Sequence, residues 1–274
     1  LPPVHRSEDP DGRRWFGMDL FAYAGFDEPG HDPWRDPRIS TLRVQFRMGE
    51  TICAAVDAFA YDGMLRTDSL PRNRGIRLAE ASPCPTAELV VVDSAGIGAR
   101  CWVDPSPGSF SRINPTTGLL AATIGAELLD TGCESVALVS PYRAQVRWLT
   151  ALAARSDGMA ASTVHRMQGS EADAIVLDLT DAAPHAKPSR LTGEDSDLAT
   201  RLLNVAASRA RGKLVVVADL EFVDQRVALG GPVRRFLDEM DNAGADHVVA
   251  LDLISSWTGT SHGAVQWYRD WSTA

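Results

Sequence analysis

The sequence predicts an α/β fold with a mainly parallel sheet flanked by helices. Short, predominantly apolar runs such as Ala174 to Leu179 and Leu214 to Ala218 have the composition of strands that are buried on both faces. Segments with apolar residues at helical spacing lie between these runs. Such alternation of strand and helix is typical of parallel sheets.

The composition indicates a folded domain with a large core. The chain has 274 residues, 45% of them hydrophobic, which is enough for one large α/β domain or a domain with appendages. The net charge of −9 argues against a broad basic face for duplex DNA, but it leaves room for a narrow groove. Of the 27 basic residues only Lys187 and Lys213 are lysines. Arginine suits bidentate phosphate contacts, and a biased genome composition explains the excess equally well.

The cysteines and the apolar segments bear on the compartment. Cys53, Cys84, Cys101 and Cys133 are far apart and lack the spacing of a zinc site. A reduced, cytoplasmic protein is the simplest interpretation. Neither a signal peptide nor a run of 18 apolar residues is present, so we expect no membrane partner.

The first third of the chain is the least regular. Residues 1–38 are rich in Asp, Gly, Pro and aromatic residues without clean periodicity, and we interpret them as a connecting insert. Their rings could stack on bases, but anchoring an irregular loop is the commoner use. From Ile39 to Leu65 a short strand or turn precedes an amphipathic helix. Residues 66–87 are polar and rich in Pro and Arg, which predicts a surface excursion.

The rest of the chain alternates between strands and helices. Residues 97–115 predict a loop with a hairpin. The part from Asp246 carries no motif, and we expect it to pack against the domain. The predicted strands are 89–92, 135–139, a short one near 162 and the two apolar runs, and the predicted helices are 117–129, 142–154, 197–209 and 232–240.

Polar residues follow several predicted strands. Ser140, the turn from Gln168 to Glu171, and Asp219 each come after an apolar strand. In open parallel sheets, ligands bind at the carboxyl ends of the strands. We therefore expect all three at that edge.

Clustered arginines come directly before the strand from Leu214. Ser208 to Arg211 are predicted to close the preceding helix and Gly212 to break it, which sets two guanidiniums beside the sheet edge. Arginines in a last helical turn often only complement the helix dipole. Here three other segments favour a partner anion.

The four segments, in order, are QFRM (Gln45 to Met48), SPYRAQ (Ser140 to Gln145), VHRMQGSEAD (Val164 to Asp173) and LNVAASRAR (Leu203 to Arg211). They resemble QYRM, TPYRAQ, VHxFQGxExD and LNVALTRAR in the second RecA-like domain of superfamily 1 helicases, in the branch of the nonsense-mediated-decay and related 5′-to-3′ helicases. The match extends from about Leu42 to Asp219. Leu1 to Val4 look like the end of the motif that closes the first RecA-like domain.

This resemblance implies a RecA-like fold of the P-loop NTPase type that lacks the Walker A half. The pattern Gly-x-x-x-x-Gly-Lys-Ser/Thr, which cradles phosphates, occurs nowhere in the sequence. The first RecA-like domain of the same polypeptide would supply it, together with the ligands for Mg²⁺. The domains expected are the connecting insert 1–38, the second RecA-like domain 39–220, and a C-terminal helix and tail 221–274.

The resemblance also implies two catalytic arginines. Arg209 matches the arginine finger of the last motif, and Arg47 matches the QYRM arginine that approaches the γ-phosphate of ATP. The simpler interpretation of both is surface charge. Arg211 is expected on another face. The family's His-Pro after QYRM is replaced here by Gly49-Glu50, so the helix start can differ.

Four further residues match the nucleotide site. Phe46 stands where the family usually has a tyrosine that stacks on the base, and a phenyl ring keeps the stacking face. Glu171 is expected near the ribose hydroxyls or the finger arginine, and Gly169 is expected to permit a close backbone approach. Gln45 belongs to the same predicted ATP site. The alternative for this turn is a plain β-turn with an exposed glutamate.

Five residues match positions that contact a single strand. The hydroxyls of Ser140 and Thr163 are expected to hold phosphates. His165, Arg166 and Gln168 are candidates for coupling the strand to the ATP site, although a lone histidine after a strand is equally often satisfied locally.

We therefore expect the C-terminal motor half of an ATP-dependent helicase or translocase on single-stranded DNA or RNA, inactive as an ATPase by itself. Two alternatives remain, since the fold does not specify the cargo. One is a non-catalytic docking module, which the intact Arg47, Glu171 and Arg209 argue against. The other is an NTP-driven remodeller that never unwinds a duplex.

Overall fold

The computed structural model describes residues 9–12, 20–26, 28, 30, 32, 35–189, 192–193 and 196–258. By its internal packing the chain divides into two units, Leu1–Arg43 and Val44–Ala274. The described part of the first unit includes the short helix α2 (Leu20–Tyr23). The second unit holds the sheet.

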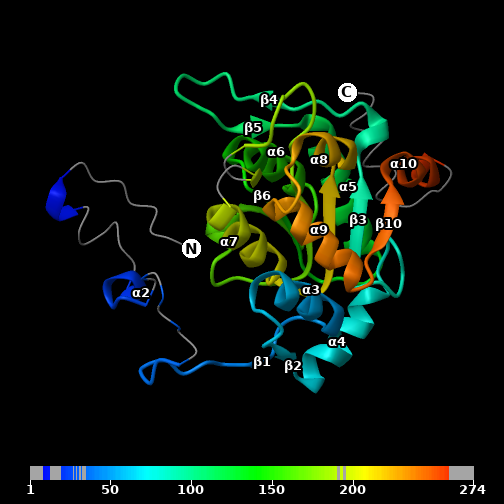
Figure 1. The fold of residues 1–274 in the computed structure, drawn as a ribbon. Coiled ribbons are helices and arrows are strands. Elements are labelled where there is room, and N and C mark those ends of the chain that lie inside the picture. Colours follow the sequence, from blue (N-terminus) through cyan, green and yellow to red (C-terminus); the bar gives the residue numbers. More distant parts are fainter. Residues whose placement is uncertain are drawn as a thin grey trace. The chain divides into compact units, whose positions relative to one another are not determined.

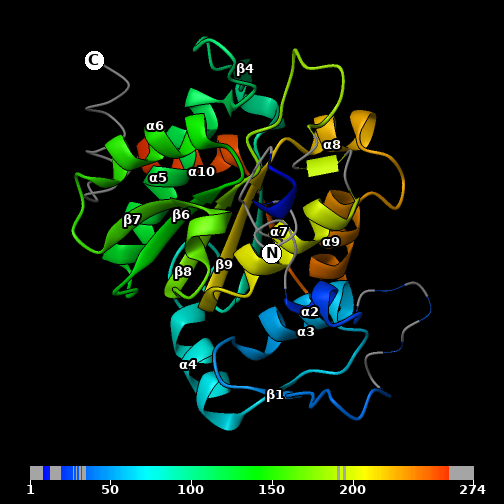
Figure 2. The ribbon, with the colours of Figure 1, turned by 90° about the vertical axis from the view of Figure 1, so that its left-hand side faces the viewer.

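Within the described residues, a parallel sheet of six strands has the order β10-β3-β9-β8-β6-β7 (Figures 1 and 2). The predicted fold class is therefore confirmed. The strands are β3 (Leu89–Asp93), β6 (Val136–Ser140), β7 (Met159–Thr163), β8 (Ala172–Asp178), β9 (Ala210–Ala218) and β10 (Asp246–Val249). Every residue of β6 and β8 is buried, as the apolar runs require.

Helices cover both faces of the sheet (Figure 2). One face carries α5 (Pro115–Asp130), α6 (Arg143–Ala153) and α10 (Ala250–Thr258). The other carries α3 (Glu50–Ala60), α7 (Ser196–Ala207) and α9 (Pro232–Asn242). The short helix α8 (Leu220–Arg226) follows β9. In Figure 1 the carboxyl ends of the strands point upward.

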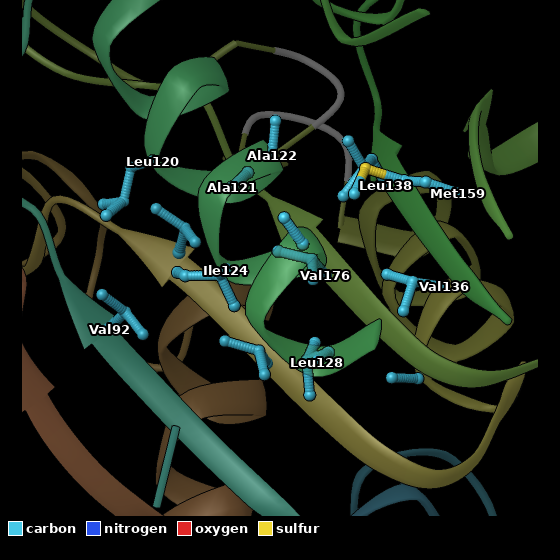
Figure 3. Close-up of a cluster of buried hydrophobic side chains, with 14 of the residues drawn as sticks. Val92, Leu120, Ala121, Ala122, Ile124, Leu128, Val136, Leu138, Met159 and Val176 are labelled. Atoms are coloured by element: carbon cyan, nitrogen blue, oxygen red, sulfur yellow. The ribbon is translucent and has the colours of Figure 1, made fainter. Parts of the chain in front are cut away.

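Helix α5 supplies the centre of the core. Leu120, Ile124 and Leu128 recur at helical spacing, are at most 2% exposed, and face side chains of β3, β6 and β8 (Figure 3). Burial of one such side chain contributes about 1.5–3 kcal/mol. The packed face of α5 thus fixes the strand ends on which the polar residues sit.

The predicted hairpin is present in the loop before α5. Its strands β4 (Trp102–Val103) and β5 (Arg112–Ile113) pair antiparallel, with Trp102 opposite Ile113. It follows the 3₁₀ turn η1 (Ala95–Ile97) and lies beyond the carboxyl ends of the sheet, at the top of Figure 1.

The prediction of a surface excursion over 66–87 is wrong, because this segment contains a packed helix, α4 (Ser69–Ala79). Asp68 caps it by accepting a hydrogen bond from the Leu70 N–H at 3.0 Å. Its outer face carries the polar residues that suggested a loop. Its inner face packs on β9 through Leu78, which is 1% exposed.

The predicted end of the arginine-bearing helix is also wrong. Helix α7 ends at Ala207, and β9 already begins at Ala210, so Gly212 lies inside a strand. A Cβ on Gly212 would stand 2.5 Å from the Cβ of Leu78. Glycine is required here because α4 approaches the strand closely, rather than because the helix breaks.

The segment after Asp246, which carries no sequence motif, adds an edge strand and a helix to the sheet. β10 pairs parallel with β3, and Trp257 of α10 is 3% exposed and donates its indole N–H to Glu127 Oε2 at 3.1 Å. Trp267 and Trp271 lie outside the described residues. Among the described helices, none has the length and apolar character needed to cross a bilayer.

Candidate functional site

Four guanidiniums and two carboxylates meet where β8 and β9 begin, at the amino-terminal edge of the sheet. The guanidiniums belong to Arg47, Arg74, Arg209 and Arg211, and the carboxylates to Glu171 and Asp173. Cations outnumber anions in this arginine cluster, so it favours a further anion.

Glu171 is held between two arginines of the cluster. Its Oε2 accepts the Arg47 Nε–H at 2.7 Å, and its Oε1 accepts from Nε and Nη2 of Arg211 at 2.9 and 2.5 Å. Hydrogen bonds from Arg47 and Arg211 lower the pKa of Glu171, so the carboxylate stays ionised. This clamp ties the loop before α3 to strand β9.

Gln45 shapes the turn that presents Arg47. Its Oε1 accepts the N–H groups of Arg47 and Met48 at 2.8 and 2.7 Å, and its Nε2 donates to Met48 O and Thr67 Oγ1, both at 2.9 Å. Both amide donors and both lone pairs are thus used within the loop and the short parallel pair β1 (Val44–Gln45) and β2 (Arg66–Thr67). The side chain positions Arg47 and has no free group for a nucleotide.

Helix α3 begins at Glu50, directly after this turn. Glu88, at the start of the neighbouring strand region, caps it by accepting the N–H groups of Thr51 at 2.8 Å and Ile52 at 3.2 Å. Burial raises the pKa of Glu88, while these N–H groups act in the opposite direction. A carboxylate from elsewhere in the chain therefore organises the helix start where the family has His-Pro.

The Arg209 side chain, like that of Arg74, makes a single hydrogen bond within the described residues. Its Nε donates to Val205 O at 3.2 Å, in the last turn of α7. Burial, and then the neighbouring Arg47, lower its pKa. Within the part of the chain that the structure describes, Nη1 and Nη2 have no hydrogen-bond partner. Arg209 thus presents an unpaired guanidinium fork, the geometry that binds phosphate or carboxylate.

Two other predicted nucleotide residues are accessible. Phe46 is 64% exposed, and its ring has no aromatic or cationic partner among the described residues. Gly169 has φ of +89°, and no described atom lies within 4 Å of a Cβ built there. The left-handed turn, and not a close approach of chain segments, therefore calls for glycine at 169.

The turn from Gln168 to Glu171 lies at the amino-terminal edge of the sheet, so its predicted place at the carboxyl edge is wrong. It leads directly into β8 at Ala172. Ser140 and Asp219 do lie at carboxyl ends, of β6 and β9. The segment 164–171, which includes the 3₁₀ turn η2 (Val164–Met167), therefore runs from one edge of the sheet to the other.

The residues predicted to contact single-stranded nucleic acid differ in how exposed their side chains are. Ser140 and Thr163 are neighbours across β6 and β7. Ser140 is fully buried, and its hydroxyl bonds to Thr180 Oγ1 at 2.9 Å and to the Tyr142 N–H at 3.3 Å. Its predicted contact with a strand phosphate does not agree with this burial. Thr163 is partly exposed.

The three predicted coupling residues lie along η2 and its end. Arg166 and Gln168 are exposed and have no hydrogen-bond partner among the described residues, so both are available to a ligand. His165 is half-buried, and burial lowers its pKa.

Two further SPYRAQ residues, Tyr142 and Gln145, make buried polar contacts. Gln145 is fully buried; its Oε1 accepts the Asn114 N–H at 2.8 Å and its Nε2 donates to Asp178 Oδ2 at 2.5 Å. Burial raises the pKa of Asp178 to about 6. Tyr142 is 1% exposed and donates its hydroxyl to Asp181 Oδ1 at 2.6 Å. The motif thus fixes α6 against the strand ends.

Sequence reasoning misplaced Arg211 and missed Arg74. Arg211 lies in β9 and bonds to Glu171, as Arg47 does, so it is part of the clamp and does not lie on another face. The error came from extending the helix to residue 211. Arg74 donates from Nη2 to the backbone carbonyl of Arg47, and burial, then Arg211, lower its pKa. It belongs to α4, which no motif marks.

The parallel sheet, the motif segments at its two edges and the arginine cluster define a superfamily 1 helicase-like domain. The chain belongs to the AAA domain family AAA_12, whose model matches residues 32–221.

Individual relatives are distant and much longer. The chain is 28% identical over 206 residues to DNA polymerase alpha-associated DNA helicase A of Saccharomyces cerevisiae, covering 70% of this chain and 29% of that protein. It is 27% identical over 201 residues to DNA-binding protein SMUBP-2 of Rattus norvegicus, covering 70% and 19%. The chain thus spans less than a third of these relatives. A solved C-terminal domain of a possible DNA helicase from Lactobacillus plantarum superposes with a TM-score of 0.40 and 15% identity, over 74% of this chain and 98% of that one.

Proposed function

We propose that this chain is the C-terminal motor half of an ATP-dependent helicase or translocase that acts on single-stranded DNA. Two relatives carry the words DNA helicase and DNA-binding in their names, which favours DNA over RNA. Because the chain spans only part of each, ATP turnover and strand movement are proposed for the polypeptide that also contains a preceding RecA-like domain.

The unpaired fork of Arg209 is the observation that carries this proposal. It lies in a cluster in which Glu171 already occupies Arg47 and Arg211. A half-buried guanidinium without an acceptor has lost part of its hydration, so an incoming phosphate anion gains both charge attraction and hydrogen bonds. The cluster therefore suits the terminal phosphate of a nucleotide.

The residues present fit ATP but not its metal ion. Arg209 and Arg47 would hold the γ-phosphate, and the exposed ring of Phe46 would stack on the base. Among the described residues no group of three His, Cys, Asp or Glu could hold a metal ion, so we assign the Mg²⁺ ligands to the preceding domain.

Each residue then has a distinct task. Bound ATP supplies the free energy of the cycle through its hydrolysis. Arg209 donates hydrogen bonds to the oxygens of the transferred phosphoryl group, where negative charge develops, as arginine fingers do. Gln45 and Arg74 hold the Arg47 backbone, and Glu171 holds the Arg47 side chain until a phosphate competes for it.

Segment 164–171 would couple the bound nucleotide to the bound single strand of nucleic acid. Glu171 at one end of it bonds to Arg47 and Arg211, and Thr163 precedes its other end at the carboxyl edge of β7. A strand phosphate bound at Arg166 and Thr163 would therefore respond to any shift of Glu171 through eight residues of chain.

Strand-stimulated ATP hydrolysis tests this proposal. The polypeptide that contains the preceding domain should hydrolyse ATP faster when single-stranded DNA is added. The 274-residue chain alone should not exceed background. Turnover by this chain alone would contradict the assignment of the phosphate-cradling loop to a separate domain.

A further inference from the structure

We propose that the β4–β5 hairpin, residues 100–113, is a second strand-binding element that stacks on bases. The inference rests on the proposed strand-binding function and extends it to a surface outside the four motif segments. It would take single-stranded nucleic acid, with phosphates bound by arginines and bases stacked on the hairpin's aromatic rings.

The hairpin exposes large apolar side chains that the core does not use. Phe110 is 89% exposed, Trp102 50% and Val103 48%. Both residues of β4 are exposed, so the strand buries neither side chain. Three large apolar side chains, two of them aromatic, are thus exposed within one hairpin. Exposed aromatic rings are available to stack on bases.

The hairpin is nevertheless held firmly. Asp104 accepts hydrogen bonds from Ser106 Oγ at 2.9 Å, Ser109 Oγ at 3.0 Å and Arg147 Nη2 of α6 at 2.8 Å. The hydrogen bond from Arg147 has the largest effect on the pKa of Asp104, and together with the bonds from the two serines it lowers that pKa. The Asp104 carboxylate therefore stays ionised. Rings on a fixed support lose little conformational freedom when a ligand binds.

The base of the hairpin is tied to the SPYRAQ segment. Arg112 donates to Asp181 Oδ1 at 2.7 Å, in an ion pair whose side chains are 12% and 7% exposed. Asp181 also accepts the Tyr142 hydroxyl at 2.6 Å, and Ser111 Oγ accepts the Ala144 N–H at 2.9 Å. The hairpin therefore stands beside the carboxyl end of β6, next to Thr163 of β7, where the proposed strand contacts begin.

The charge around the rings favours a polyanion. The Arg100 guanidinium lies over the Trp102 ring, 5.8 Å from its centroid. Arg143 precedes Arg147 by one helical turn, so it lies on the side of α6 that contacts the hairpin. In the described part of the chain neither Arg100 nor Arg143 has a carboxylate partner. Arginines beside exposed aromatic rings are the combination by which single strands are bound without sequence preference.

Comparing an oligonucleotide that has bases with one that lacks them separates base stacking from phosphate binding. The probe is a labelled oligothymidylate of about 20 nucleotides, long enough for several base contacts, and a matched oligonucleotide in which every position is abasic. Fluorescence anisotropy gives Kd for the 274-residue chain, its Phe110→Ala and Trp102→Ala variants, and Leu229→Ala. Leu229 is 89% exposed, as Phe110 is, and belongs to the connection between α8 and α9 and not to the hairpin, so it is the matched control.

Each hairpin variant should weaken binding of the oligothymidylate by roughly 5- to 150-fold, the range for loss of one stacked base. The same variants should bind the abasic strand as the wild-type chain does, and Leu229→Ala should change neither Kd. Phe110→Tyr keeps an aromatic ring and should keep wild-type affinity, while unchanged binding of the abasic strand by Phe110→Ala rules out a folding defect.

Two other outcomes are distinguishable. If the wild-type chain binds the oligonucleotide and Arg166→Ala weakens it, but both hairpin variants bind as wild type, the hairpin is not a strand-binding surface and the proposed function stands. If the wild-type chain binds no strand at low salt, the proposed strand-binding function itself fails.

Discussion

Arg211 holds Glu171 through two of its nitrogens, Nε at 2.9 Å and Nη2 at 2.5 Å, and both bonds end on Oε1. The second carboxylate oxygen is thereby left for Arg47, from a distant segment of the chain. Two partly exposed ion pairs of this kind add little stability. Their effect is to fix where the Arg47 guanidinium points.

Glu171→Ala should therefore impair turnover much more than folding. Because the side chains of Arg47 and Glu171 are 37% and 35% exposed, unfolding free energy should change by less than about 1 kcal/mol. Strand-stimulated kcat/KM of the polypeptide with its preceding domain should fall at least about tenfold, as expected when a catalytic group is mispositioned. Urea titration and steady-state kinetics measure the two effects. Glu239→Ala, at a partly exposed glutamate of α9, is the control and should change neither.

Gly212→Ala should destabilise the chain by forcing α4 away from β9. The added Cβ would lie 2.5 Å from Leu78 Cβ, and overpacking of this kind costs about 1–3 kcal/mol. Gly96→Ala is the matched control, because no described atom lies within 4 Å of a Cβ there; it should stay within about 0.5 kcal/mol of wild type. Equal stability of the two variants in urea would contradict the close packing of α4 on the strand.

Lys213 should give the chain a distinctive pH dependence. It is fully buried, donates to Ala79 O at 3.1 Å and Cys84 O at 2.8 Å, and burial lowers its pKa to about 8 from 10.5. Between these values the unfolded chain binds more protons than the folded one, so stability contributed by this residue rises with pH and is lost as pH falls through about 8.

The comparison with Lys213→Met isolates this effect. Unfolding free energy of wild type minus that of the variant should increase between pH 8 and 10.5, by at most about 3 kcal/mol. Other titrating groups cancel in the difference. A difference that is constant over this range would show that Lys213 is not titrating as a buried group.

Ser140 and Arg166 should separate structure from strand binding. Ser140→Ala removes a buried hydroxyl from the Thr180 and Tyr142 network, so it should lower the unfolding free energy while the affinity of the folded chain for single strands stays within about twofold. Arg166→Ala should leave stability unchanged and weaken binding, with the slope of log K against log salt reduced by about one contact. Anisotropy titrations of both variants at several salt concentrations measure the affinity for single strands and its salt dependence. A large affinity loss in folded Ser140→Ala would restore the original assignment.

Regular periodicity made most of the fold predictable. The apolar runs that became β3, β6, β8 and β9 can be buried only in a sheet covered on both faces, and the helices between them carry clear apolar faces. Helix α4 was not predicted, because only one narrow face of it, ending in Leu78, is apolar. Strand β10 was not predicted, because its residues are mostly exposed at the edge of the sheet.

The candidate site was less predictable, because its geometry depends on tertiary packing. Motif positions predict Arg47, Glu171 and Arg209 as site residues, but no local pattern shows that Glu171 lies between Arg47 and Arg211. Likewise, the hydroxyl of buried Ser140 bonds to Thr180, forty residues later in the chain. Single-sequence patterns report which face of an element is apolar, but not which polar groups from other elements meet there.

The turnover of Arg209→Ala tests most directly the proposal that the positive charge of Arg209 stabilises the transferring phosphoryl group. The control is Arg201→Ala, an exposed arginine on the same helix α7. Both are measured as strand-stimulated kcat in the polypeptide with its preceding domain. Arg209→Lys is included because a lysine keeps the charge but not the fork.

Arginine fingers contribute roughly 10³- to 10⁵-fold to rate. Arg209→Ala should therefore lower kcat by at least about two decades, with Arg209→Lys recovering little, while nucleotide-free strand binding and the Arg201→Ala variant stay near wild type. If kcat of Arg209→Ala equals that of Arg201→Ala, Arg209 is not the finger, and its guanidinium only complements the dipole at the end of α7.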